Sequence, residues 1–162
     1  MSAPTQAASD FSFQHFSEVL HSAVQEVFSK MVGIELTVPE GKPAPAVMDV
    51  TGIVGLAGKL CGVLTVRCTA QTGAIIASQM LGIPVAEAGE QAGDAIGEIS
   101  NMVAGNFKAK LLLALEDQCL LSVPTVITGR DYQMHSLAAG NRVELPFSHD
   151  GDVFWINLEI RN

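Results

Sequence analysis

The most informative stretch of this chain reads GDAIGEISNMVAGNF, residues 93–107, and it has two unlike faces. Apolar residues recur at spacings of three and four and predict one buried side of a helix: Ala92, Ile96, Ile99, Val103 and Phe107. Asp94, Glu98 and Asn101 follow the same spacing on the opposite side. The stretch therefore predicts a long helix, running to about Leu115, that packs on a core and turns two acids and an amide outward.

Glycines accompany this polar row. Gly89, Gly93 and Gly97 recur every fourth residue, which favours close packing of the helix against another helix in the core. Gly97 and Gly105 lie near the polar row, where each costs about 1 kcal/mol of helix stability relative to alanine. We expect such a helix to let a partner's backbone approach closely. The alternative is that the row is only the solvated side of an amphipathic helix.

Working outward, the pattern predicts more strands than helices. We expect a helix over 12–31 with a core stripe from Phe13 to Met31, and a second helix over 71–81 capped by Thr69. Predicted strands follow alternating or apolar runs: 34–38, 47–56, 60–67, 125–128, 142–147 and 153–160. The order of one helix, three strands, two helices and three strands predicts an α+β domain with a mostly antiparallel sheet and helices packed on it.

Composition bounds what this domain does. Apolar residues make up 48% of the 162 residues and charged residues 16%, which predicts one compact domain over 12–162 after a flexible N-terminal lead-in, 1–11. The net charge of −8, without a Lys or Arg cluster, argues against nucleic acid or an anionic membrane surface as a partner. No apolar run is long enough to span a bilayer, and no signal peptide is evident.

The reactive residue types are scattered. Cys61, Cys68 and Cys119 follow no metal or disulfide pattern and are expected to be free, buried thiols in a reducing cytoplasm. His15 and His21 face different ways on the first predicted helix, and His135 and His149 lie far from them in the sequence, so no metal site is expected. No serine or cysteine nucleophile is paired with a base in the sequence.

The four residues Asp94, Glu98, Asn101 and Pro124 carry a family resemblance. Their spacing, D-x3-E-x2-N-x22-P, resembles the signature of the CheC/CheX/FliY phosphatases of bacterial chemotaxis. The segments 101–108 and 121–129 are also similar to the family's helix and following strand. Only one such motif is present, because 71–81 contains no Glu-x2-Asn, and this makes the chain CheX-like.

The resemblance implies a function. Such proteins remove the phosphoryl group from the aspartyl phosphate of a response-regulator receiver domain of the CheY type, and CheX proteins are homodimers. By the resemblance, Asn101 orients the attacking water, Glu98 pairs with the receiver's Lys, and Asp94 extends the contact. Pro124 is expected to shape the turn into the next strand. We infer that Gly105, one turn after Asn101, leaves room for the partner.

The same resemblance implies that this chain binds no cofactor itself, since the receiver brings the Mg²⁺. One alternative is a non-catalytic CheX-like dimer that binds or sequesters a receiver or another signalling protein. Another is a structural dimer with no receiver partner. A strand edge such as 153–160 is one candidate for pairing between two copies, and a helix is another.

Overall fold

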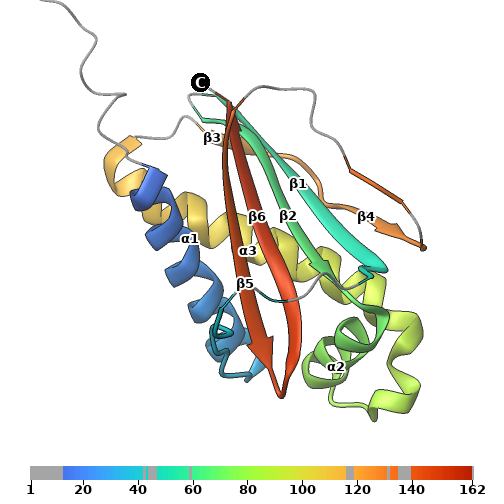
Figure 1. The fold of residues 1–162 in the computed structure, drawn as a ribbon. Coiled ribbons are helices and arrows are strands. Elements are labelled where there is room, and N and C mark those ends of the chain that lie inside the picture. Colours follow the sequence, from blue (N-terminus) through green and yellow to red (C-terminus); the bar gives the residue numbers. More distant parts are fainter. Residues whose placement is uncertain are drawn as a thin grey trace, which may run out of the picture.

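The computed structural model describes residues 13–41, 43, 47–58, 60–115, 119–130, 132–134 and 140–161. Within them, helices cover one face of a six-stranded antiparallel sheet (Figure 1). The helical elements are α1 (Phe13–Val27), the π-helical turn η1 (Phe28–Val32), α2 (Ala70–Leu81), the 3₁₀ turns η2 (Val85–Glu87) and η3 (Gly89–Gln91), and α3 (Ala92–Leu115). The strands are β1 (Val50–Gly58), β2 (Cys61–Cys68), β3 (Cys119–Leu121), β4 (Thr125–Thr128), β5 (Asn141–His149) and β6 (Asp152–Arg161).

The sheet has the strand order β3-β1-β2-β6-β5, and β4 pairs with β1 on the same edge as β3. Every pairing is antiparallel. Alternate residues of β2 and β6 are buried beneath the helices: Leu64, Val66, Cys68, Phe154, Ile156, Leu158 and Ile160. The prediction of an α+β domain with a mostly antiparallel sheet is confirmed. The order of elements needs correction, as follows.

Two predicted strand assignments differ from the structure. Residues 34–38 form no strand, because only Thr37 pairs with the neighbouring strand β5, in an isolated bridge to Ser148. Cys119–Leu121, which was not predicted, forms β3 against the end of β1. The observed order is therefore one helix, two strands, two helices and four strands, not three strands on either side of the helix pair.

The end of the first helix also differs from its prediction. The stripe that includes Leu20, Val24 and Val27 is buried, but Met31 is 63% exposed. The cause is the π turn η1, which holds an extra residue and shifts the phase of the apolar face. As a result Phe28 and Val32 enter the core and Met31 turns outward. Gly33 then ends the turn in a left-handed conformation, with φ of 78°.

Local signals in the rest of the chain behave as their chemistry predicts. The Thr69 hydroxyl accepts a hydrogen bond from the Thr72 amide and so caps α2, and Gly82 ends that helix in the left-handed region. Asp150 and Gly151, with positive φ, form the tight turn between β5 and β6. The predicted lead-in 1–11 lies outside the described residues.

The cysteines are free, as expected, but not all of them are buried. Cys68 and Cys119 lie in the interior, where burial raises the pKa of both thiols, that of Cys68 to about 12. Cys61 is exposed because it begins β2 at the rim of the sheet. The expectation of three buried thiols was therefore wrong for Cys61.

Candidate functional site

The helix α3 lies across the sheet, behind it in Figure 1, and presents one side to solvent. The predicted apolar face is confirmed, since these residues are all buried: Ala92, Ile96, Ile99, Val103 and Phe107. Asp94, Glu98 and Asn101 are exposed. The structure therefore holds the helix on the core by one face and leaves the predicted polar row outside.

The polar row makes no side-chain interaction within the described part of the chain. Among the described residues, no hydrogen bond or ion pair is made by the side chains of Asp94, Glu98 or Asn101. Residues three and four apart on a helix are neighbours, with Cβ atoms about 5–6 Å apart. Two carboxylates and an amide are thus carried side by side on a rigid helix, and all remain available to a partner.

The glycines beside the row serve helix packing on a strand. A Cβ at Gly97 would lie 3.0 Å from Val126 Cγ2, and one at Gly93 would lie 3.8 Å from Val126 Cγ1. Gly97 therefore lets α3 approach β4, whereas a Cβ at Gly93 would make an ordinary contact, so the predicted packing of this glycine run on a helix is at Gly97 packing on a strand. At Gly97 the close neighbour belongs to this chain and not to a docked protein.

Gly105 differs from these two glycines. A Cβ placed there meets nothing within 4 Å, and the residue is partly exposed one turn beyond Asn101. Nothing in the described residues requires glycine at this position for packing. Its predicted role in leaving room for a partner stays a prediction.

A close contact between β1 and α3 fixes the position of Asn101 relative to the sheet. Gly52 of β1 packs directly beneath α3, where a side chain would overlap the Ser100 hydroxyl and lie 3.1 Å from Ile96 Cγ2. Ser100 is fully buried, and its hydroxyl donates to the Ile96 carbonyl at 2.7 Å. The residue before Asn101 is thus clamped on the sheet. Gly52 and Ser100 were not predicted, because their only signal in the sequence is a glycine inside a strand.

Pro124 lies in the short link between β3 and β4. Ser122 in that link exchanges hydrogen bonds with Gly55 of β1: its amide donates to the Gly55 carbonyl at 2.9 Å, and its hydroxyl accepts from the Gly55 amide at 2.8 Å. Pro124 then leads into β4, where Val126 supports Gly97. The structure thus places the last residue of the motif next to the strand on which α3 rests.

The other polar cluster on α3 is paired within the chain. Lys110 Nζ lies 2.7 Å from Glu26 Oε2 on α1, Lys30 Nζ lies 3.1 Å from Glu26 Oε1, and the Asn106 amide donates to the Ala23 carbonyl at 3.3 Å. The ammonium groups of Lys110 and Lys30, with a smaller effect of the Asn106 amide, lower the pKa of Glu26 to about 2. This cluster lies partly exposed to solvent, but its charges are paired with one another and join α1 to α3.

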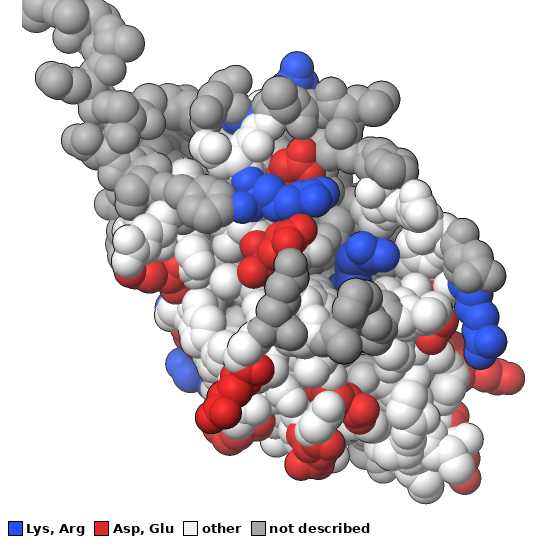
Figure 2. Space-filling model, viewed as in Figure 1, with Lys and Arg blue, Asp and Glu red and all other residues white. Residues whose placement is uncertain are grey.

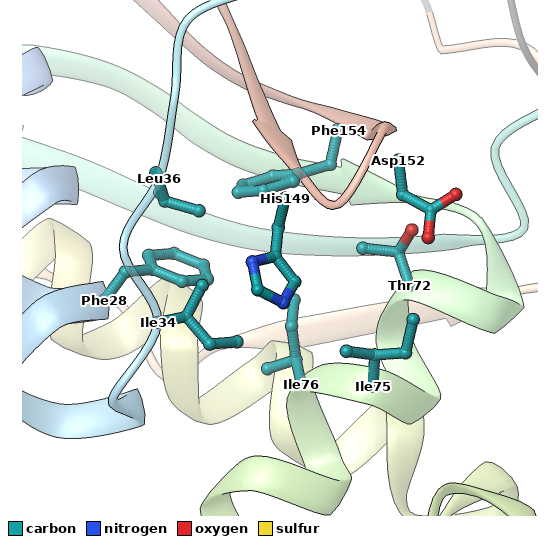
Figure 3. A pocket seen from close by; sticks show the side chains of 9 residues that line it. All are labelled: Phe28, Ile34, Leu36, Thr72, Ile75, Ile76, His149, Asp152 and Phe154. Atoms are coloured by element: carbon teal, nitrogen blue, oxygen red, sulfur yellow. The ribbon is translucent and has the colours of Figure 1, made fainter.

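The hairpin turn between β5 and β6 encloses a small hollow (Figure 3). His149 points into it between Phe28 and Ile76, and Phe154 lies above the ring. The cavity measures about 10 Å³, so it has room for about one water molecule at most. His149 is therefore a packing residue here. Among the residues that the structure describes, no three His, Cys, Asp or Glu side chains gather as metal ligands would.

Membrane insertion through α-helices finds no support in the same residues. No helix in the described part of the chain is both long and apolar enough to cross a bilayer.

The fold and the site together define an α+β domain that carries an exposed row of acids and an amide on its longest helix. A model of the family described as "Chemotaxis phosphatase CheX" matches residues 50–148. The CheY-P phosphatase CheX of Thermotoga maritima is 30% identical over 135 residues, which cover 80% of this chain and 84% of that protein. The chain belongs to the CheX family of chemotaxis phosphatases.

Solved structures agree with this assignment. The chemotaxis protein CheX from Vibrio vulnificus matches with a TM-score of 0.78 at 25% identity, covering 97% of this chain and 100% of that one. A chain of the CheX–CheY–BeF₃–Mg²⁺ complex from Borrelia burgdorferi matches with a TM-score of 0.71 at 25% identity, covering 91% and 98%. The resemblance inferred from the motif is confirmed at the level of the family.

Proposed function

We propose that this protein hydrolyses the aspartyl phosphate of a CheY-like receiver domain, with Asn101 orienting the attacking water and Glu98 pairing with the receiver's Lys. The observation that carries the proposal is the exposed, unengaged row of Glu98 and Asn101 on a helix clamped to the sheet. The name of the Thermotoga maritima relative and the Borrelia burgdorferi complex with CheY support the choice of partner.

The chemistry suits a site without its own nucleophile. In hydrolysis, a water oxygen forms a bond to phosphorus while the bond from phosphorus to the aspartyl oxygen breaks. The products are inorganic phosphate and a free carboxylate. The receiver supplies the phosphorylated Asp, a Lys and Mg²⁺, so the helper protein only has to position and orient.

Asn101 has the groups that this task needs. Its side-chain oxygen accepts a hydrogen bond from water and its NH₂ donates, so one amide fixes both the place and the direction of the water. Glu98, one turn before it, offers a negative charge to the receiver's Lys and sets the register of docking. Asp94 extends that contact by another turn of the helix. Gly105 has no side chain, so it leaves room for the receiver at the other end of the row.

The proposal also includes the assembly and location expected from the resemblance, a homodimer in the cytoplasm. One suggested dimer edge is wrong, because β6, which contains 153–160, lies inside the sheet between β2 and β5. Within the described residues the free edges are β5 and the β3–β4 side. Size-exclusion chromatography with light scattering measures the state directly, and a monomer at all concentrations would remove the dimer from the proposal.

Turnover separates the enzyme from a module that merely sequesters its partner. A phosphorylated receiver with Mg²⁺ is mixed with this protein at roughly one-fiftieth of its concentration, and the loss of acyl phosphate is followed. An enzyme clears all of the phosphorylated receiver faster than its spontaneous decay. A sequestering module binds at most one receiver per copy, so it affects only about one-fiftieth of the phosphorylated receiver. That result would overturn the catalytic assignment.

A further inference from the structure

The face of the sheet opposite α3 carries a polar surface that the phosphatase site does not use. Side chains of β2 and β6 that point away from the helices include Thr65, Arg67, Asn157 and Glu159. Figure 2 views this face and shows Lys or Arg and Asp or Glu side chains lying against one another over the sheet. Such a face needs a partner or water to satisfy its groups.

A cavity of about 340 Å³ opens on this face. Its walls come from four strands and from the segment after β4: Ile53, Val63, Thr65, Arg67, Met134, Arg142, Glu144, Asn157 and Glu159. Sites for small organic ligands begin at about 300 Å³ and combine apolar walls with a few polar groups. This cavity is of that size and kind, unlike the 10 Å³ hollow at His149.

Two buried polar atoms of the cavity lining have no partner among the described residues. These atoms, Arg67 Nε and Asn157 Oδ1, are inaccessible to solvent and make no hydrogen bond there. Thr65 pairs with Asn157 across β2 and β6, so Arg67, two residues further along, is the diagonal neighbour of Asn157 on the same face. An unused donor and an unused acceptor therefore belong to neighbouring side chains on this face, and unpaired buried polar atoms are rare in folded proteins.

The charges of the cavity are separated. Arg142 lies 3.4 Å from a carboxylate oxygen of Glu144 and 3.7 Å from one of Glu159, so this trio carries one excess negative charge. Arg67 has no carboxylate within ion-pair distance among the described residues. Val63 stands opposite Glu159, and Arg67 is four residues further along β2, about 13 Å by strand rise. The cavity thus has a positive end and a negative end.

We propose that this cavity binds a small zwitterion of the dipeptide class. Its carboxylate lies on the Arg67 guanidinium, which recognises planar carboxylates through paired N–H groups. Its amino group lies toward Glu144 and Glu159, and its alkyl part packs on Ile53, Val63 and Met134. An anion alone would leave the Glu144–Glu159 end unused, and a cation alone would leave Arg67 unused.

The site is independent of the proposed phosphatase function. Ile53 of β1 lines the cavity, whereas its neighbour Gly52 packs against α3 on the other side of the sheet. Ligand binding therefore requires no docked receiver, and a failure of either proposal leaves the other standing.

Calorimetric titration of the whole protein with L-alanyl-L-alanine, acetate and ethylammonium tests the proposal. We expect the dipeptide to bind with a Kd of about 1 mM or tighter, and the two single-charge probes to bind at least roughly tenfold more weakly. Absence of dipeptide binding at ten times that concentration would overturn the proposal. Equal binding of acetate, which indicates a plain anion site, would overturn it too.

Variants locate the binding. Arg67→Met removes the cation at similar volume and should weaken dipeptide binding at least tenfold, and Arg67→Lys should restore part of it. The matched control is Arg130→Met, because Arg130 is an exposed arginine outside the cavity. Equal losses for Arg67→Met and Arg130→Met would contradict the site. If Arg67→Met does not fold, Asn157→Ala tests the same cavity, and unchanged binding would then count against it.

Discussion

Two asparagines that lie five residues apart on α3 have different surroundings. Asn106 is half-buried and donates to the Ala23 carbonyl of α1, beside the Glu26–Lys110 ion pair. Asn101 is exposed and has no partner among the described residues. The same helix therefore uses one polar cluster to hold the fold together and leaves another free. A polar side chain that a stable fold does not engage is the better candidate for chemistry on a partner.

The largest expected effect comes from exchanging the two asparagines for alanine in turn. Asn101→Ala should lower the rate of acyl-phosphate loss from a phosphorylated receiver about 100-fold or more, because the water loses its orientation. Asn106→Ala should leave that rate within about threefold but lower the free energy of unfolding by about 1 kcal/mol, the worth of one hydrogen bond. Dephosphorylation kinetics and urea unfolding are measured on both variants. The comparison fails if Asn106→Ala loses the activity and Asn101→Ala loses the stability.

The clamp beneath Asn101 can be disturbed through Gly52. Gly52→Ala should destabilise the fold by about 2 kcal/mol, because the new methyl group overlaps the Ser100 hydroxyl and crowds Ile96. Ser100→Ala in the same chain should recover part of that loss.

Gly105→Ala is the matched control for Gly52→Ala in urea unfolding. It meets nothing within 4 Å and should stabilise the helix by up to about 1 kcal/mol. Equal stability for Gly52→Ala and the unmodified protein would show that β1 does not fix the position of α3.

The two glutamates Glu98 and Glu26 should differ in function in the same way as the two asparagines. Glu98→Gln should weaken the binding of a receiver about fivefold at low salt, about 1 kcal/mol for a partly exposed charge pair, and less at high salt. Glu26→Gln should leave receiver binding unchanged, because its carboxylate already faces Lys110 and Lys30. Fluorescence titration at two salt concentrations measures both, and a larger loss for Glu26→Gln would contradict the assignment.

The smallest effect is the response of the structural cluster to acid. The lowered pKa of Glu26, about 2 against an ordinary 4.5, means that its ionised form stabilises the folded state. That contribution is present above pH 4.5 and disappears as the pH falls toward 2. The stability gap between the unmodified protein and Glu26→Gln should therefore narrow over this range in denaturant titrations. A gap of the same size at pH 6 and pH 2 would speak against the ion pairs.

Sequence alone predicted the fold class and the faces of α3 because helix and strand periods are local. The apolar spacing of Ile96, Ile99 and Val103 needs no knowledge of what covers it. Prediction from the sequence failed where the position of one element depends on its packing against another. The π turn that turns Met31 outward, the short β3 and the packing of Gly97 on Val126 all arise from tertiary contacts.

The candidate site shows the same division. The motif from Asp94 to Pro124 could be read as a pattern, but the pattern does not say that Gly52 and Ser100 clamp the helix beneath it. The cavity at Arg67 and Asn157 was not predicted either, because its residues come from four strands that are brought together only by the sheet.

The most direct test of the central claim measures binding and turnover together for Asn101→Ala. The receiver carries beryllofluoride as a stable phosphate mimic for the binding arm and true aspartyl phosphate for the turnover arm. If Asn101 orients water, the affinity for the mimic stays within about threefold while kcat falls about 100-fold or more. Loss of affinity and kcat in equal measure would make Asn101 a docking residue, and an unchanged kcat would remove it from the mechanism.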